Sequence, residues 1–300
     1  MILKTSKNSY LPYFLLLIQP AFMASNLVVA RGGVEYVPPI SLAFWRWFFV
    51  FLILFPFNFQ TIFKNIRFLK KEYKKLFFLG AMGCGVCGAF PFMAGMTTTV
   101  ANMGIIYTSS PIFIILISSY FYKERLNAFQ YLGLCLCFAG VVSIIAKGDT
   151  SLLINLKFTS GDLWMLGAAV GWALYAVFLL NWKSKFSLFS RFTIIAFFGA
   201  ASLLPFSLIE NYFIRPVIFN NGFYFWTIFA AISPGIIAFS LYTQAQKHLG
   251  ASVTGFTLYL FTVYGAFYGI FIFGEQLKSY HYYGAILVFL GMFVVRKKNN

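Results

Sequence analysis

One charged side chain interrupts a long apolar stretch and is the first candidate for chemistry. Arg46 lies within "ISLAFWRWFFVFLILF", eight residues after Pro38. A charge inside an apolar helix is costly, so it needs a reason. A guanidinium held there could bind an anionic group such as a carboxylate. Alternatively its role is structural, and the side chain reaches an interface or donates to carbonyl groups of a neighbouring helix.

Other polar groups also lie inside apolar runs. Asn26 follows Gln19 by about two helical turns, which places both on one face. Asn26 could bind a ligand or join its helix to a partner. The remaining candidates for a binding cavity are mostly aromatic residues with a polar edge: Tyr107, Trp172, Tyr175, Tyr242, Gln244 and Tyr259. Such residues line amphipathic cavities, but they also serve as packing and interfacial anchors.

Residue types that hold metals or act as nucleophiles are few and scattered. Cys84 and Cys87 form a CxxC, and a CxC follows at 135–137, but no histidine or charge accompanies either pair. Small residues in apolar runs favour helix packing over metal or redox chemistry. We therefore expect no catalytic residue, no metal site, no cofactor and no enzymatic activity; a polytopic membrane enzyme is the remote alternative.

The composition indicates whether the segments that carry these residues lie in water or in lipid. Sixty per cent of the 300 residues are hydrophobic, 10% are charged, and the mean hydropathy is +0.80. Soluble domains carry about 25% charged residues. The sequence therefore predicts a membrane protein, and its runs do not alternate as barrel strands do. Ten apolar runs are expected as helices, at 10–30, 39–58, 76–96, 101–122, 128–146, 162–181, 188–209, 223–244, 251–273 and 281–296.

The first run has some features of a secretory signal. Its length, and the polar Ser25 and Asn26 inside it, favour an uncleaved first helix instead.

The formal charge of +16 is distributed unevenly over the expected loops. If the N-terminus is cytoplasmic, seventeen of the 23 lysines and arginines fall on the cytoplasmic side and five on the outer side. This bias predicts cytoplasmic N- and C-termini. The basic cluster at 64–75 suits anionic lipid headgroups, so membrane lipids rather than nucleic acid are the expected partners. The oligomeric state, monomer or homodimer, stays open.

The sequence contains the same motif twice. "KERLNAFQYLGLCLCFAG" begins at Lys123, and "GEQLKSYHYYGAILVFLG" begins at Gly274, so Glu124 and Glu275 are 151 residues apart. Five helices per copy is an odd number, so the second copy must enter the membrane from the opposite side. We expect an all-α polytopic protein of two inverted five-helix repeats, at 1–148 and 162–300, with an outer linker at 149–161. Such inverted repeats are typical of secondary transporters.

Prolines predict bends near the middle of two helices. Pro91 and Pro111 each remove a backbone hydrogen bond inside an apolar run, and bent helices often frame a transport site. Packing adjustment is an equal alternative for Pro91. The second copy has Thr262 at the position of Pro111, so a matching bend there would need another cause, such as Gly265.

Several motifs in order resemble the drug/metabolite transporter superfamily, specifically its ten-helix EamA-type transporters. They are "MASNLVVARGGVEYVPPISLAFWRWFFVFLILFP", "YTSSPIFIILISSYFYKERL", "GWALYAVFLL", "YTQAQKHLGASVTGF" and "FGEQL". The resemblance covers nearly the whole chain and implies export or uptake of small metabolites, such as amino acids, by alternating access. The family usually has proline where this chain has Thr262.

The acidic residues are informative about coupling. All seven fall in expected loops or at helix ends: Glu35, Glu72, Glu124, Asp149, Asp162, Glu210 and Glu275. Proton-driven carriers commonly use an acid or histidine buried in the path. We therefore expect a facilitator or exchanger in a plasma membrane. The frequent Phe, Lys and Asn residues suggest an AT-rich genome, so we expect a bacterial origin. A channel-like facilitator is the main alternative.

Overall fold

The computed structural model describes residues 11–123, 128–146, 159–242 and 257–295, and within them the chain forms ten successive helical segments. These are α1 (Leu11–Gly32), α2 (Pro39–Lys64), α3–η2–α4 (Ile66–Leu79, Gly80–Val86, Cys87–Gly95), α5–α6 (Val100–Tyr107, Ser110–Tyr122), α7 (Ala128–Ile145), α9 (Ser160–Asn181), α10 (Leu188–Phe213), α11–η3 (Asn221–Ala230, Ala231–Ile237), α13 (Thr257–Phe273) and α14 (Ser279–Val295). A short 3-10 turn, η1 (Gly33–Glu35), links α1 to α2.

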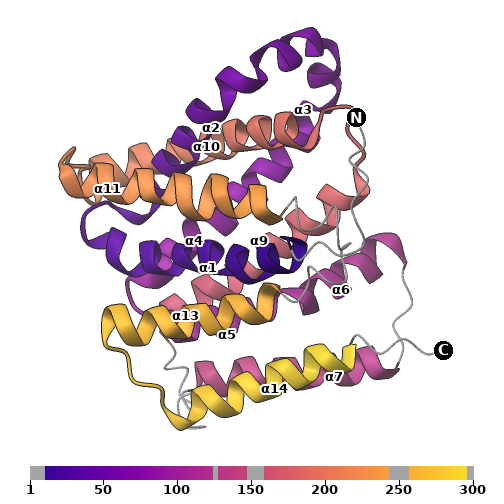
Figure 1. The fold of residues 1–300 in the computed structure, drawn as a ribbon, viewed down its shortest axis with the longest axis vertical. Helices are drawn as coiled ribbons and strands as arrows, with labels where there is room; N and C mark the ends of the chain where they lie inside the picture. The colour runs from indigo at the N-terminus through magenta and orange to yellow at the C-terminus, as the bar shows by residue number, and fades with distance from the viewer. Residues whose placement is uncertain (1–10, 124–127, 147–158, 243–256, 296–300) are drawn as a thin grey trace.

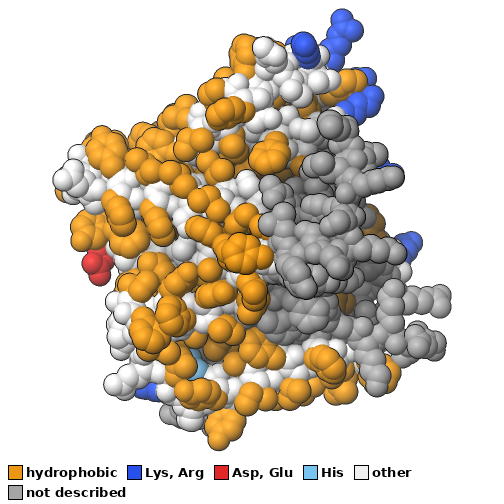
Figure 2. Space-filling model, viewed as in Figure 1, with side chains coloured by type: hydrophobic (Ala, Val, Ile, Leu, Met, Phe, Trp, Pro, Cys, Tyr) orange, Lys and Arg blue, Asp and Glu red, His pale blue; other side chains and the backbone are white. Residues whose placement is uncertain are grey.

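The helices have the length and surface of membrane spans. Six segments of 22 to 30 residues are long and apolar enough to cross a bilayer. The hydrocarbon core needs about 17–25 helical residues, which the other four segments also supply. Large apolar side chains stay exposed, such as Phe57 at 83% and Leu180 at 81%. Outside the grey area, orange apolar side chains are spread over the visible face from top to bottom, whereas blue basic side chains gather mainly near α3 (Figure 2). The chain is an all-α polytopic membrane protein, as predicted.

Helices of the first repeat pack against helices of the second. The most extensively packed pairs between the repeats are α2 with α10, α7 with α14, α4 and α6 with α9, α1 and α5 with α13, and η2 with α10. Figure 1 shows these pairs stacked from α2 and α10 down to α7 and α14, with α1 beginning and α14 ending at the same end of the bundle. The opposite end, formed by 32–39, 95–100, 213–221 and 273–279, is called the latch end below. The architecture is two inverted repeats in one bundle.

Repeated glycines allow this close pairing. A methyl group on Gly140 of α7 would lie 2.7 Å from the carbonyl oxygen of Gly284 on α14. Both glycines belong to the duplicated motif of the sequence. A similar crossing joins η2 to α10, where a methyl on Gly80 would lie 2.7 Å from the backbone nitrogen of Gly199. Small residues at these positions let helix backbones touch, which drives helix association in lipid.

The duplicated motif also repeats a backbone turn. Lys123 and Gly274 both adopt left-handed conformations, with φ of 56° and 64°, and they are 151 residues apart. The next residue in the second copy, Glu275, accepts hydrogen bonds from the backbone nitrogens of Val100 (2.8 Å) and Ala101 (3.2 Å) at the start of α5. A carboxylate there stabilises the helix N-terminus. Its counterpart, Glu124, lies outside the described residues.

Two π-helical segments occupy matching positions in the repeats. Each end of η3 lies 151 residues after the corresponding end of η2. A π segment widens the helix by one residue per turn and is frequent at functional sites. Pro234 lies within η3, while Pro91 lies in α4, after η2. Sequence periodicity did not indicate either segment.

The helix around Pro111 is interrupted rather than merely bent. α5 ends at Tyr107 and α6 begins at Ser110, so the break falls just before Pro111. At the matching position of the second repeat, α13 is continuous through Thr262. The Thr262 hydroxyl instead hydrogen-bonds across the repeats to the Thr108 hydroxyl and to the Gly104 carbonyl oxygen (3.3 Å). A gating role for Pro91 and Pro111 stays a prediction.

Candidate functional site

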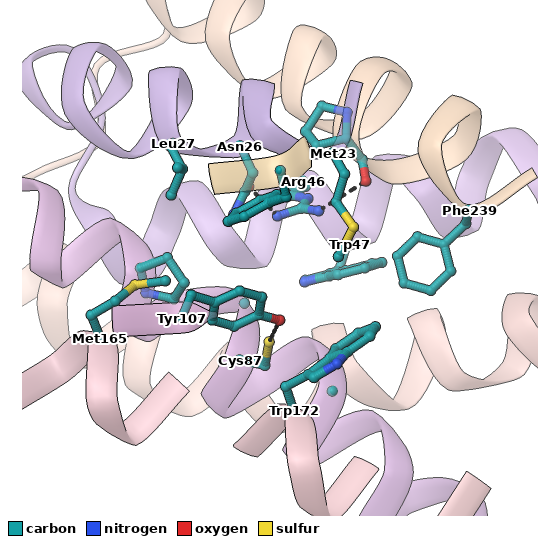
Figure 3. Close-up of a pocket in the computed structure, with 15 residues that line it drawn as sticks. Met23, Asn26, Leu27, Arg46, Trp47, Cys87, Tyr107, Met165, Trp172 and Phe239 are labelled. Carbon is teal, nitrogen blue, oxygen red and sulfur yellow. Dashed lines mark hydrogen bonds between the residues drawn. The ribbon is translucent and has the colours of Figure 1, made fainter. Parts of the chain in front are cut away.

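A small cavity of about 50 Å³ lies at the centre of the bundle, between the two repeats. Five residues that the sequence singled out line it: Asn26, Arg46, Pro91, Tyr107 and Trp172. They come from α1, α2, α4, α5 and α9, and both π segments contribute lining residues as well. The labelled side chains in Figure 3 converge on this space from opposite walls. The fold therefore gathers residues that are up to about 150 positions apart in the sequence.

Arg46 is the polar centre of this cavity. Its side chain is only 4% exposed. Nη1 donates to Oδ1 of Asn26 at 2.6 Å, and Nη2 to the carbonyl oxygen of Pro234 at 3.5 Å, as the dashed lines in Figure 3 show. The guanidinium also lies 4.6 Å from the ring centroid of Trp47, a cation–π distance. Nε has no hydrogen-bond partner among the residues that the structure describes.

The charge of Arg46 is not neutralised within the described part of the chain. Its hydrogen bonds go to an amide and a carbonyl, and no ion pair with a carboxylate is formed there. A guanidinium stays protonated in proteins, and an uncompensated buried charge is costly. An anionic group entering the cavity would relieve that cost and could meet the planar donors in a charge-assisted, bidentate fashion.

The opposite wall is aromatic. The Tyr107 hydroxyl and Cys87 Sγ lie 3.3 Å apart, and the Tyr107 ring lies 6.3 Å from Trp172 and 5.5 Å from Phe261. Cys84 and Cys87 are free thiols. Among the residues that the structure describes, no group of three histidines, cysteines or acids comes together as metal ligands would. The cavity thus combines one cation with an apolar wall.

A second, larger cavity of about 420 Å³ lies beside the first and toward the end opposite the latch end. Tyr175 and Tyr242 line this cavity rather than the one around Arg46, and Trp172 and Phe239 border both. The remaining predicted site residues are not placed: Gln244 and Glu124 lie outside the described residues, and so does the side chain of Tyr259.

Burial of several charged residues is the main point that the sequence did not predict. Arg191, expected at the cytoplasmic end of the helix at 188–209, lies in the first turn of α10 with 8% of its surface exposed, and it borders the larger cavity. Asp162, Glu210 and His281 are at helix ends as expected, yet they too are buried. Helix-end positions are normally solvated, so their burial follows from contacts between repeats that a single helix pattern does not encode.

Asp162 joins the two repeats at the latch end. Its carboxylate accepts hydrogen bonds from the Thr98 hydroxyl (2.5 Å), from Asn102 Nδ2 (3.3 Å) and from the Thr159 hydroxyl. Beside it, the backbone nitrogen of Gly161 donates to Thr97 Oγ1 at 2.9 Å. These contacts tie the start of α9 to the segment between α4 and α5 and to the start of α5.

Comparison with known proteins points in one direction. The model of the EamA-like transporter family matches residues 11–146 and again residues 159–297. An uncharacterized transporter of Bacillus subtilis, YyaM, is 28% identical over 93% of this chain and 92% of its own length. An uncharacterized transporter of Archaeoglobus fulgidus is 26% identical over 96% of this chain and 98% of its own. A solved crystal structure shares the fold, with a TM-score of 0.59 at 18% identity, over 94% of this chain and 95% of that one.

Proposed function

The chain belongs to the EamA-like transporter family, and we propose that it is a secondary carrier for a small carboxylate-bearing metabolite, such as an amino acid, working by alternating access. The relatives are named as transporters without a stated cargo, so the cargo class is argued from the cavity. The observation that carries the proposal is Arg46, a buried cation in the central cavity whose Nε is unpartnered and whose charge meets no acid in the described residues.

The geometry supports a carboxylate as the bound group. Arg46 offers planar donors, and Asn26 fixes the guanidinium through Nη1. A cavity of about 50 Å³ holds roughly three to five water-sized groups at about 10–15 Å³ each. That number fits a carboxylate and its neighbouring atoms. Trp172 and Tyr107 then provide an apolar surface for the adjoining part of the cargo.

The state of the bundle supports alternating access. Asp162 and its partners join the two repeats at the latch end, while the larger cavity lies toward the other end. With the N-terminus cytoplasmic, as the loop charges favour, this arrangement is an inward-facing conformation of a protein in a bacterial plasma membrane, acting in export or uptake. Because the repeats are inverted copies, an exchange of their conformations would open the latch end.

We further propose that transport is not driven by a proton gradient and that the protein has no enzymatic activity. The central cavity is lined by Arg46 and by amide, aromatic and thiol groups, and its described lining residues include no acid or histidine. In proteoliposomes, uphill accumulation of cargo driven by a pH gradient alone would refute the uncoupled mechanism.

The test of the carboxylate site starts from metabolite profiling of cells with and without the protein. Metabolites that change are then measured for binding to the purified protein, beside their neutral amide analogues. We expect Arg46→Gln to weaken carboxylate binding at least tenfold, while Arg46→Lys retains part of it because the charge remains. A folded Arg46→Gln protein that binds carboxylates normally would show that Arg46 has only a structural role.

A further inference from the structure

The larger cavity contains its own buried cation. Its walls come from α6, α9, α10 and the segment that follows η3, and Arg191 of α10 is the cation among its described lining residues. At about 420 Å³ this cavity has the size of an ordinary ligand pocket, for which about 300–1,000 Å³ is typical. Neither the family match nor the named relatives assign a role to it.

Arg191 has a structural role and spare donor capacity. Nη1 donates to the carbonyl oxygen of Leu179 at 3.1 Å and Nη2 to that of Trp182 at 2.8 Å, at the end of α9. Within the described part of the chain Nε has no hydrogen-bond partner, and only 8% of the side chain is exposed. The carboxylate of Glu72 accepts a hydrogen bond from the Ser184 hydroxyl at 2.6 Å. Within the described residues it forms no ion pair with Arg191.

A second feature favours an anion in this cavity. Leu188 and Phe189, the first two residues of the 26-residue helix α10, line the cavity next to Arg191. The backbone N–H groups at a helix start point outward and carry the positive end of the helix dipole. Ser187 caps the nitrogen of Ser190, and the nitrogens of Leu188 and Phe189, at the first two helical positions, have no partner within the helix by geometry. The guanidinium and the helix start thus act on the same space.

The two cavities are separated by a thin aromatic partition. Trp172 and Phe239 border both cavities. The Trp172 ring packs at a tilt on Tyr107 (6.3 Å) and Tyr175 (5.4 Å). The Phe239 ring packs edgewise on Trp47 (6.3 Å) and stacks on Phe192 (4.6 Å). Movement of these two side chains would connect the cavities.

We propose that the larger cavity is a second anion-binding site, in which Arg191 holds the carboxylate of an organic acid with an apolar or aromatic body before the acid passes Trp172 and Phe239 to reach Arg46. The aromatic and aliphatic walls suit such a body, and Ser118, Asn181 and Ser240 add polar contacts. This site rests on the proposed carrier function, since it supplies cargo to the central cavity.

The test compares two probes of nearly equal shape on the purified full chain: 3-phenylpropionate and its neutral amide, 3-phenylpropanamide. In the conformation that the structure shows, the central cavity of about 50 Å³ is too small for the probe, so its first binding reports on the larger cavity. We expect the acid to bind at least tenfold more tightly than the amide. Arg191→Gln should reduce this preference to less than threefold, and Arg46→Gln should leave it in place. A purely structural Arg191 would alter the thermal unfolding midpoint without changing the preference.

A second variant avoids disturbing the end of α9. Ser118→Asp places a carboxylate in the same cavity from α6, and Ser118→Asn is its neutral control. We expect the aspartate to weaken 3-phenylpropionate binding about tenfold and to leave amide binding within twofold. If Arg46→Gln rather than Arg191→Gln removes the acid preference, the second site is refuted while the carrier function stands. If neither Arg191→Gln nor Ser118→Asp changes the preference, the second site is refuted, and the carrier function is then judged separately by counterflow.

Discussion

Replacement of Asp162 by asparagine should loosen the latch end in a way that can be calculated. The carboxylate is fully buried in the first turn of α9 and receives the Thr98 and Asn102 hydrogen bonds from the other repeat. Asn keeps the shape but removes the charge and replaces one acceptor oxygen by a donor. The hydroxyl groups can rotate to accept, so the network should weaken rather than vanish.

The expected magnitude follows from the change in hydrogen-bond type. Hydrogen bonds to charged groups contribute about 1.5–3 kcal/mol and neutral ones about 0.5–1.5 kcal/mol. Weakening the two bonds that cross the repeats by about 1 kcal/mol each makes closure of the latch end less favourable by about 2 kcal/mol. At about 1.4 kcal/mol per factor of ten, the ratio of latch-open to latch-closed protein should rise about 30-fold.

The assay is side-specific cysteine labelling. Met165 lies one turn after Asp162 on α9 and lines the central cavity, so Met165→Cys in a background without the native cysteines reports access to that cavity. A small membrane-impermeant thiol reagent is added from the latch side of oriented vesicles. Asp162→Asn should raise the labelling rate by about the calculated 30-fold.

Glu210 provides a matched control at the same end of the bundle. Its carboxylate accepts hydrogen bonds from the backbone nitrogens of Ile40 (3.1 Å) and Ser41 (2.7 Å), joining α10 to α2, which pack along their length. Glu210→Gln should therefore lower thermal stability with less than a threefold change in Met165→Cys labelling. Equal labelling in the Asp162→Asn and parent proteins would refute the latch, and a similar rise in both variants would show general loosening instead.

Three further predictions concern the repeat itself, each measured as the thermal unfolding midpoint of the purified protein. Gly140→Ala should destabilise it by about 1–3 kcal/mol because the methyl meets α14, whereas Gly104→Ala, whose methyl has its closest contact at 3.6 Å, should change it by less. Gly274→Ala should cost about 1–2 kcal/mol for its left-handed backbone, and Lys123→Gly should not destabilise the matching turn. Glu275→Gln should cost about 1 kcal/mol by weakening two bonds to the start of α5. Equal effects of Gly140→Ala and Gly104→Ala, or of Gly274→Ala and Lys123→Gly, would contradict these assignments. An unchanged midpoint of the Glu275→Gln protein would do so as well.

The sequence predicted the fold because hydrophobic length and repetition are local signals. The ten apolar runs, the inverted five-helix repeats and the family resemblance are all confirmed. The shared offset of 151 residues extends further than the motif that revealed it, to the left-handed residues Lys123 and Gly274 and to both π segments. Even so, the residues of "GAMGCGV" are all apolar or small. They therefore show no periodicity that could distinguish a π turn from an α turn.

The site was less predictable because it depends on contacts between distant segments. Arg46 was found from its charge alone. Its hydrogen bond to Asn26 joins α2 to α1, which is the helix-joining role considered for that amide. Arg191 was missed because it follows a polar loop with Lys183 and Lys185, which suggests solvent; in the structure its side chain folds back onto the end of α9. Binding of cargo by any of these residues stays a prediction until it is measured.

Counterflow is the most direct test of the claim that one central site is exposed alternately to the two sides. Proteoliposomes are preloaded with unlabelled cargo identified by profiling, and entry of labelled cargo is followed without any ion gradient. A carrier with the proposed mechanism should show saturable entry, several-fold faster and transiently uphill in preloaded vesicles, and Arg46→Gln should abolish it. Entry that does not saturate and is indifferent to preloading would identify a channel and contradict alternating access.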